Sequence, residues 1–126
     1  MELVPLLQLA RSVLVAEGAK DSELSISFVG REEMEALHVR WTGEDGPTDV
    51  LSFEIGEADA EGVRILGDVV ICPEVAKEAA NAYEDELRLL LVHGILHLLG
   101  HDHEELAERR VMWDKQEAHT GIRVQL

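Results

Sequence analysis

The sequence from His93 to His103 reads HGILHLLGHDH and contains four of the chain's six histidines. His93 and His97 are four residues apart, so in a helix they lie on one face about one turn apart. Gly100 is well placed to end that helix, because glycine adopts the left-handed conformation that lets the chain reverse. The reversal can bring His103 back to the same point. The stretch therefore predicts a metal site formed by a helix and the turn after it.

Three imidazoles suit zinc, although iron, nickel and copper also accept this kind of ligand. Three protein ligands leave a fourth position open, which is typical of a catalytic zinc rather than a structural one. We predict one zinc ion per chain, bound by His93, His97 and His103. His101 competes for the third place, but it directly follows the turn glycine, so His103 is preferred.

The histidine spacing also matches the ligand skeleton of the metzincin peptidases, HExxHxxGxxH. In those enzymes a glutamate directly after the first histidine is the general base. This chain has Gly94 at that position. The spacing therefore predicts the metal scaffold, whereas a peptidase would need a carboxylate base from outside the motif.

The charge of the chain restricts its partners. Twenty-six acidic residues stand against 11 basic ones, which gives a formal net charge of −15. Such a surplus argues against a generic nucleic-acid binder and against docking on an anionic membrane, and it favours a basic partner. An RNA substrate therefore needs a further source of affinity.

Length and composition indicate one domain, residues 1–126. No apolar run approaches the roughly 18–20 residues that a membrane span needs. The first residues contain no basic segment of the kind that opens a signal peptide, and Cys72 is the only cysteine. We therefore expect a cytoplasmic protein without membrane association.

The spacing of apolar residues predicts both helices and strands. We expect strands at Leu24–Val29, Asp49–Ile55 and Val63–Ile71, with an acidic hairpin loop at Glu57–Gly62. We expect helices from Pro5 to Gly18 and at Arg31–Trp41, Pro73–Tyr83, Glu84–Leu99 and Glu105–His119. This mixed order predicts the α+β class. The expected domain has a mixed sheet of about four strands packed with about five helices, and a metal cleft formed by the central helix and its following turn.

Three blocks resemble one known family. The histidine stretch is similar to the HGxLHLxGYDH signature of the YbeY family, the bacterial metal-dependent endoribonucleases of rRNA maturation. Residues 47–53, PTDVLSF, match the family's PTDVLSF strand, and residues 66–71, LGDVVI, resemble its LGDIVI strand. The blocks occur in the family's order, and the resemblance covers nearly the whole chain.

The resemblance implies a small α+β domain with one zinc in a cleft and His93, His97 and His103 as its ligands. It implies a single-strand-specific endoribonuclease for the 3′ end of 16S rRNA and for ribosome quality control. Charge and family together suggest that a basic ribosomal protein guides the chain to the small ribosomal subunit, and no DNA substrate is expected. A metallopeptidase-like hydrolase and a non-catalytic, metal-bearing ribosome-assembly factor remain alternatives.

Two positions depart from the family's pattern. His101 stands where the family has tyrosine, and Thr42 stands where many members have an arginine. Arg40 lies two residues before Thr42, so it is the candidate to replace that arginine in stabilising the phosphate.

Several other side chains have two interpretations each. Asp102 either orients a ligand imidazole or occupies a solvated turn. Asp49, with Thr48 and Ser52, either lines the cleft or fixes a turn. The remaining expectations are that Glu104 is a first-turn helix acid and that Cys72 is a small core or capping residue. Trp41 and Trp113 are expected to anchor the core, with base-stacking platforms as the alternative.

Overall fold

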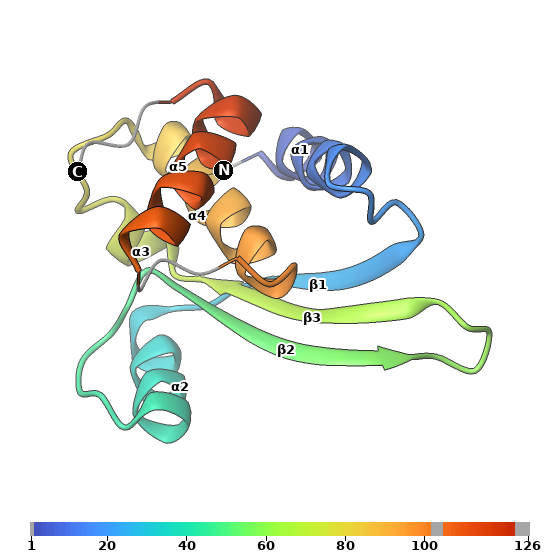
Figure 1. Ribbon diagram of the computed structural model, residues 1–126. Coiled ribbons are helices and arrows are strands. Elements are labelled where there is room, and N and C mark those ends of the chain that lie inside the picture. Colours follow the sequence, from blue (N-terminus) through green and yellow to red (C-terminus); the bar gives the residue numbers. More distant parts are fainter. Residues whose placement is uncertain (1, 102–104, 123–126) are drawn as a thin grey trace.

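The computed structural model describes residues 2–101 and 105–122 (Figure 1). Its helices and strands alternate irregularly along the chain, as the α+β class requires. The helices are α1 (Leu3–Ala16), α2 (Arg31–Thr42), α3 (Pro73–Ala76), α4 (Tyr83–Leu98) and α5 (Leu106–Thr120). The strands are β1 (Ser22–Phe28), β2 (Val50–Ala58) and β3 (Arg64–Ile71).

The three strands form one mixed sheet in the order β1-β3-β2. β1 runs parallel to β3, and β2 pairs antiparallel with β3 as a hairpin. Asp59 closes the hairpin, because its carboxylate accepts hydrogen bonds from the backbone N–H groups of Glu61 and Val63. The mixed sheet and the hairpin confirm the prediction from sequence, but the loop is shorter than predicted, because Glu57 and Ala58 still pair with β3.

The helices cover the two faces of the sheet unequally. α1 and α4 pack on one face, α5 packs on α4, and α2 lies on the other face (Figure 1). Alternation along the strands explains this division. On β3, Val69 and Ile71 are buried with α4, whereas Val70 packs against Met34 of α2. The predicted α4 is the central helix, and most of its residues from Leu87 to Leu98 are buried.

One expectation about the elements is not confirmed and another is wrong. The residues that the structure describes contain three strands, without the fourth that was expected. The helix expected at Pro73–Tyr83 ends at Ala76. After Ala76 the backbone hydrogen bonds span three residues instead of four. The N–H of Glu78 donates to the carbonyl of Val75, and the N–H of Ala79 donates to the carbonyl of Ala76. The chain then turns into α4.

Trp41 also corrects an expectation. Its side chain is 59% exposed rather than buried in the core, since it lies near the end of α2 and its ring meets the sheet only edge to face at Phe53. Trp113 is half-buried, under the guanidinium of Arg109. Cys72 is fully buried next to Met34, as expected. In the part of the chain that the structure describes, no helix is long and apolar enough to span a membrane.

Candidate metal centre and active site

The two histidines at the centre of the predicted site lie side by side on α4. The ring centroids of His93 and His97 are 4.8 Å apart, with an angle of 73° between the ring planes. Both side chains are half-buried. The i, i+4 spacing has thus produced the adjacency that the sequence predicted, on the side of α4 that faces α5.

A buried glutamine on α5 holds the first histidine. Nδ1 of His93 lies 2.7 Å from Oε1 of Gln116, whose side chain is almost completely buried. An amide oxygen only accepts, so Nδ1 carries the proton and the lone pair of the ring is on Nε2. Partners of this kind fix the tautomer and the orientation of metal-binding histidines. The arrangement therefore fits a histidine that coordinates through Nε2.

The sequence interpretation missed Gln116. A signal for it was present, because Met112, Gln116 and Thr120 follow each other at helical spacing and all three are buried. A glutamine in a core-facing stripe needs a hydrogen-bond partner. Only the tertiary structure identifies that partner as His93.

Gly94, which occupies the place of the peptidase glutamate, faces the sheet. A Cβ at this position would lie 2.6 Å from Cγ1 of Val69 and 3.2 Å from Oγ of Ser52. No side chain fits there without moving β3 or α4. The close packing of α4 on β3 therefore leaves no space for the glutamate that the metzincins have at this position.

The end of α4 reverses as expected. Gly100 has φ +97°, and its N–H donates to the carbonyl of His97, while the N–H of His101 donates to the carbonyl of Leu96. These two bonds form a Schellman motif, which satisfies the last carbonyls of the helix.

His103, the predicted third ligand, lies outside the described residues, as do Asp102 and Glu104. Within residues 2–101 and 105–122 no group of three metal-ligating side chains occurs. The three-histidine site and the metal cleft therefore stay predictions. The donor set at His93 and His97 fits a zinc ion, since both are imidazoles and one has its second nitrogen fixed by Gln116.

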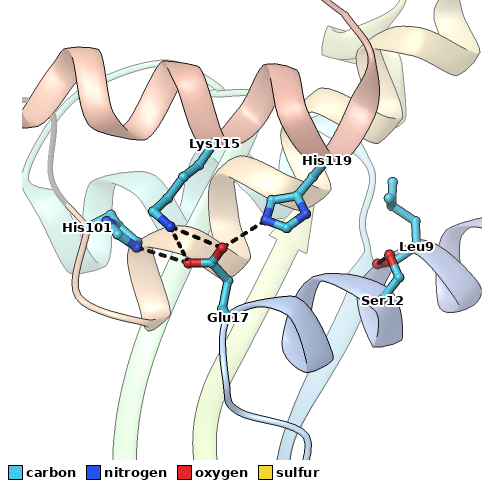
Figure 2. A network of polar contacts seen from close by, with 6 residues as sticks. All are labelled: Leu9, Ser12, Glu17, His101, Lys115 and His119. Carbon is cyan, nitrogen blue, oxygen red and sulfur yellow. Dashed lines mark hydrogen bonds and ion pairs between the residues drawn. The ribbon is translucent and has the colours of Figure 1, made fainter.

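A second polar cluster joins the turn after α4 to α1 and α5 (Figure 2). Glu17, at the end of α1, accepts hydrogen bonds from Lys115 at 2.9 and 3.2 Å, and its other contacts are Nε2 of His119 at 3.0 Å and Nε2 of His101 at 3.5 Å. Burial raises the pKa of Glu17, but the bonds from Lys115 and His119 outweigh it, so the pKa lies below its ordinary value. Glu17 thus holds the chain just before the predicted third ligand.

The other candidate residues occupy different places. Ser52 on β2 donates to the carbonyl of Gly94, 3.2 Å away, so it touches α4 directly after His93. Thr48 and Asp49 precede β2, where the hydroxyl of Thr48 lies 3.5 Å from the carboxylate of Asp49. Ser52 is thus brought against the histidine helix.

Arg40 and Thr42 lie on α2, on the opposite face of the sheet from α4 (Figure 1). The guanidinium of Arg40 stands 5.3 Å from the ring centroid of Trp41. The hydroxyl of Thr42 donates to the carbonyl of His38 and accepts from the N–H of Glu44, so it caps the end of α2. The catalytic role of Arg40 stays a prediction.

Comparisons with known proteins show the family of the chain. The sequence profile of the family described as Endoribonuclease YbeY matches residues 5–121. The chain belongs to the YbeY endoribonuclease family. Among curated YbeY relatives, the chain is 47% identical to a Frankia alni protein, over 90% of the chain and 70% of the relative. It is 54% identical to one from Beutenbergia cavernae, over 75% of the chain and 70% of the relative.

A solved structure shares the YbeY chain's fold. The solution structure of TM1509 from Thermotoga maritima superposes with a TM-score of 0.64 at 33% sequence identity. The match covers 94% of this chain and 78% of that protein. The chain therefore shares its overall fold with TM1509.

Proposed function

We propose that this chain is a zinc-dependent, single-strand-specific endoribonuclease that matures the 3′ end of 16S rRNA in the cytoplasm and takes part in ribosome quality control. The observation that carries the proposal is the His93–His97 pair on α4, with Nδ1 of His93 bonded to Gln116. Membership of an endoribonuclease family supports RNA as the substrate.

The chain's own residues supply the binding and the positioning. His93 and His97 would hold the metal, with His103 as the third ligand, and Gln116 keeps the His93 ring in the required tautomer. A bound zinc supplies Lewis acidity, which lowers the pKa of water and polarises a phosphoryl oxygen. The residues leave open whether water or the neighbouring 2′-hydroxyl attacks the phosphodiester.

The position of Gly94 disfavours the peptidase alternative. Its place against Val69 leaves no room for the glutamate base of the metzincins. We therefore propose phosphodiester rather than peptide hydrolysis. A non-catalytic assembly factor would have the same metal site, so only a measurement of RNA turnover distinguishes it from a nuclease.

The partners proposed are the small ribosomal subunit and a basic ribosomal protein. The formal charge of −15 repels phosphates over a Debye length of about 8 Å at physiological salt. A basic protein surface would offset this repulsion and bring the histidine pair to the RNA.

The test is RNA cleavage by purified protein, before and after removal of its metal. We expect one zinc per chain by elemental analysis, metal-dependent cleavage of a single-stranded rRNA fragment, and no turnover of casein. His97→Ala should lose both metal and cleavage, whereas the exposed α5 residue Asp114→Ala should keep both. Metal-dependent peptide turnover, or RNA cleavage that survives in His97→Ala, would overturn the proposal.

A further inference from the structure

The face of the sheet opposite α4 contains a hollow of about 680 Å³ beside α2. β1 contributes Ser25 and Ser27 to its lining, β3 contributes Asp68, and β2 contributes Phe53. Trp41 of α2 forms part of its wall. The hollow lies on the face of the sheet opposite His93 and His97, so it is separate from the candidate metal centre.

The wall of the hollow is aromatic and exposed. Trp41 is 59% exposed, and its ring packs edge to face on Phe53, with centroids 5.7 Å apart. The guanidinium of Arg40 stands over the same indole. Indole rings and guanidinium planes are the surfaces on which proteins stack unpaired bases. The contact with Phe53 holds the indole in place before any ligand arrives.

The floor of the hollow is a hydrogen-bond acceptor. The carboxylate of Asp68 accepts a hydrogen bond from the hydroxyl of Ser25. Two carboxylate oxygens offer about four lone-pair sites, so most of the acceptor capacity of Asp68 remains for a ligand. Glu54 also lines the hollow, so its lining is acidic and disfavours phosphate groups. A neutral group with N–H donors fits this lining.

We propose that the hollow binds one unpaired guanine base of the RNA substrate. Guanine presents N1–H and the N2 amino group side by side, which matches the two oxygens of Asp68, and its ring can stack on Trp41. Adenine lacks the N1–H donor, and hypoxanthine lacks the amino group. The choice of ligand rests on the proposed ribonuclease function.

The hollow also has a structural connection to the histidine helix. Ser52 lines the hollow on β2 and donates to the carbonyl of Gly94, next to His93. The hollow and the histidines lie on opposite faces of the sheet, so RNA with a guanine in the hollow would pass around the β2 edge to reach His93 and His97.

The experiment is a titration with 5′-GMP, 5′-IMP and 5′-AMP, followed by ¹H–¹⁵N NMR of the intact protein. The three nucleotides carry the same phosphate, so differences report the base. The indole N–H of Trp41 is the reporter, and Trp113→Phe assigns it. We expect GMP to shift the Trp41 signal and to bind about tenfold more tightly than IMP or AMP, because each alternative loses a bond to a charged acceptor.

Two variants test the acceptor on the floor and the aromatic wall separately. Asp68→Asn and Trp41→Leu should each weaken GMP binding about tenfold. Asp114→Asn on α5, the charge-matched control outside the hollow, should leave GMP binding within about threefold of wild type. Equal affinity for the three nucleotides, shifts that bypass Trp41, or full binding by Asp68→Asn would overturn the guanine site.

The experiments distinguish a failure of the proposed RNA cleavage from a failure of the proposed guanine binding. A protein that cleaves RNA but shows no shift at Trp41 retains the nuclease function and loses the guanine site. A protein that binds GMP at Trp41 but never cleaves RNA retains the site and loses the nuclease proposal.

Discussion

At the scale of single residues, the bond between His93 and Gln116 is the contact that most directly prepares a metal site. Gln116→Ala removes the acceptor for Nδ1–H, so the ring loses its fixed tautomer and orientation. We expect zinc affinity to fall about 10–100-fold, measured by competition with a chromogenic chelator. Gln116→Glu retains an acceptor and should recover most of the affinity. Unchanged affinity in Gln116→Ala, with an unchanged melting temperature, would show that Gln116 only fills the core.

Arg40 tests whether a cation on α2 acts in the reaction. Because α2 and α4 lie on opposite faces of the sheet, such a role requires the substrate to pass around the β2 edge. A catalytic Arg40 predicts that Arg40→Ala lowers single-turnover cleavage about 10²–10³-fold, while metal content and melting temperature stay near wild type. Cleavage within about threefold of wild type would restrict Arg40 to its contact with Trp41.

At the scale of elements, the close approach of α4 to β3 depends on Gly94. A methyl group there would lie 2.6 Å from Cγ1 of Val69. Alanine favours a helix over glycine by about 1 kcal/mol, but overpacking costs about 1–3 kcal/mol, so Gly94→Ala should destabilise the fold in urea unfolding. The double variant Gly94→Ala/Val69→Ala should lose less than the sum of the two single variants. Strict additivity would contradict the contact.

Glu17 joins α1, α5 and the turn after α4 (Figure 2). Its pKa is lowered in the folded protein, so its stabilising effect is present above the ordinary pKa of about 4.3 and is lost as the pH falls through the lowered value. Glu17→Gln should therefore lower the melting temperature at pH 7, and the difference from wild type should shrink towards pH 3. Glu57→Gln, an exposed carboxylate on β2, is the control. A difference that is constant with pH would exclude the charge of Glu17 as its cause.

At the scale of the whole molecule, the net charge of −15 governs how the chain meets RNA. A basic protein with 6–10 phosphate contacts loses about 10³–10⁵ in affinity between 50 and 200 mM salt. We expect this chain to bind naked single-stranded RNA weakly. Its affinity, measured by fluorescence anisotropy, should change less than about tenfold between 50 and 200 mM salt. Adding a basic ribosomal protein should raise the affinity. Tight, steeply salt-dependent binding to naked RNA would contradict this.

The pattern of apolar and polar residues along the chain predicted most of the helices and strands, because their determinants are local. Period-two alternation placed β1, and helical spacing together with Gly100 placed α4 and its end. The helix expected at Pro73–Tyr83 was too long because the spacing of its residues says nothing about the turn into α4. Trp41 was assigned to the core because it follows Met34 and Leu37 at helical spacing, whereas its side chain is 59% exposed near the end of α2.

The sequence by itself determined that His93 and His97 share a helix face, since the four-residue spacing acts through local backbone geometry. It also identified the family and the absence of a peptidase base at Gly94. Only the tertiary structure decided that Gln116 supports His93, that Gly94 faces β3, and that Trp41, Phe53 and Asp68 surround one hollow. These groups come from different elements, and their contacts follow from packing across the sheet, which no local pattern encodes.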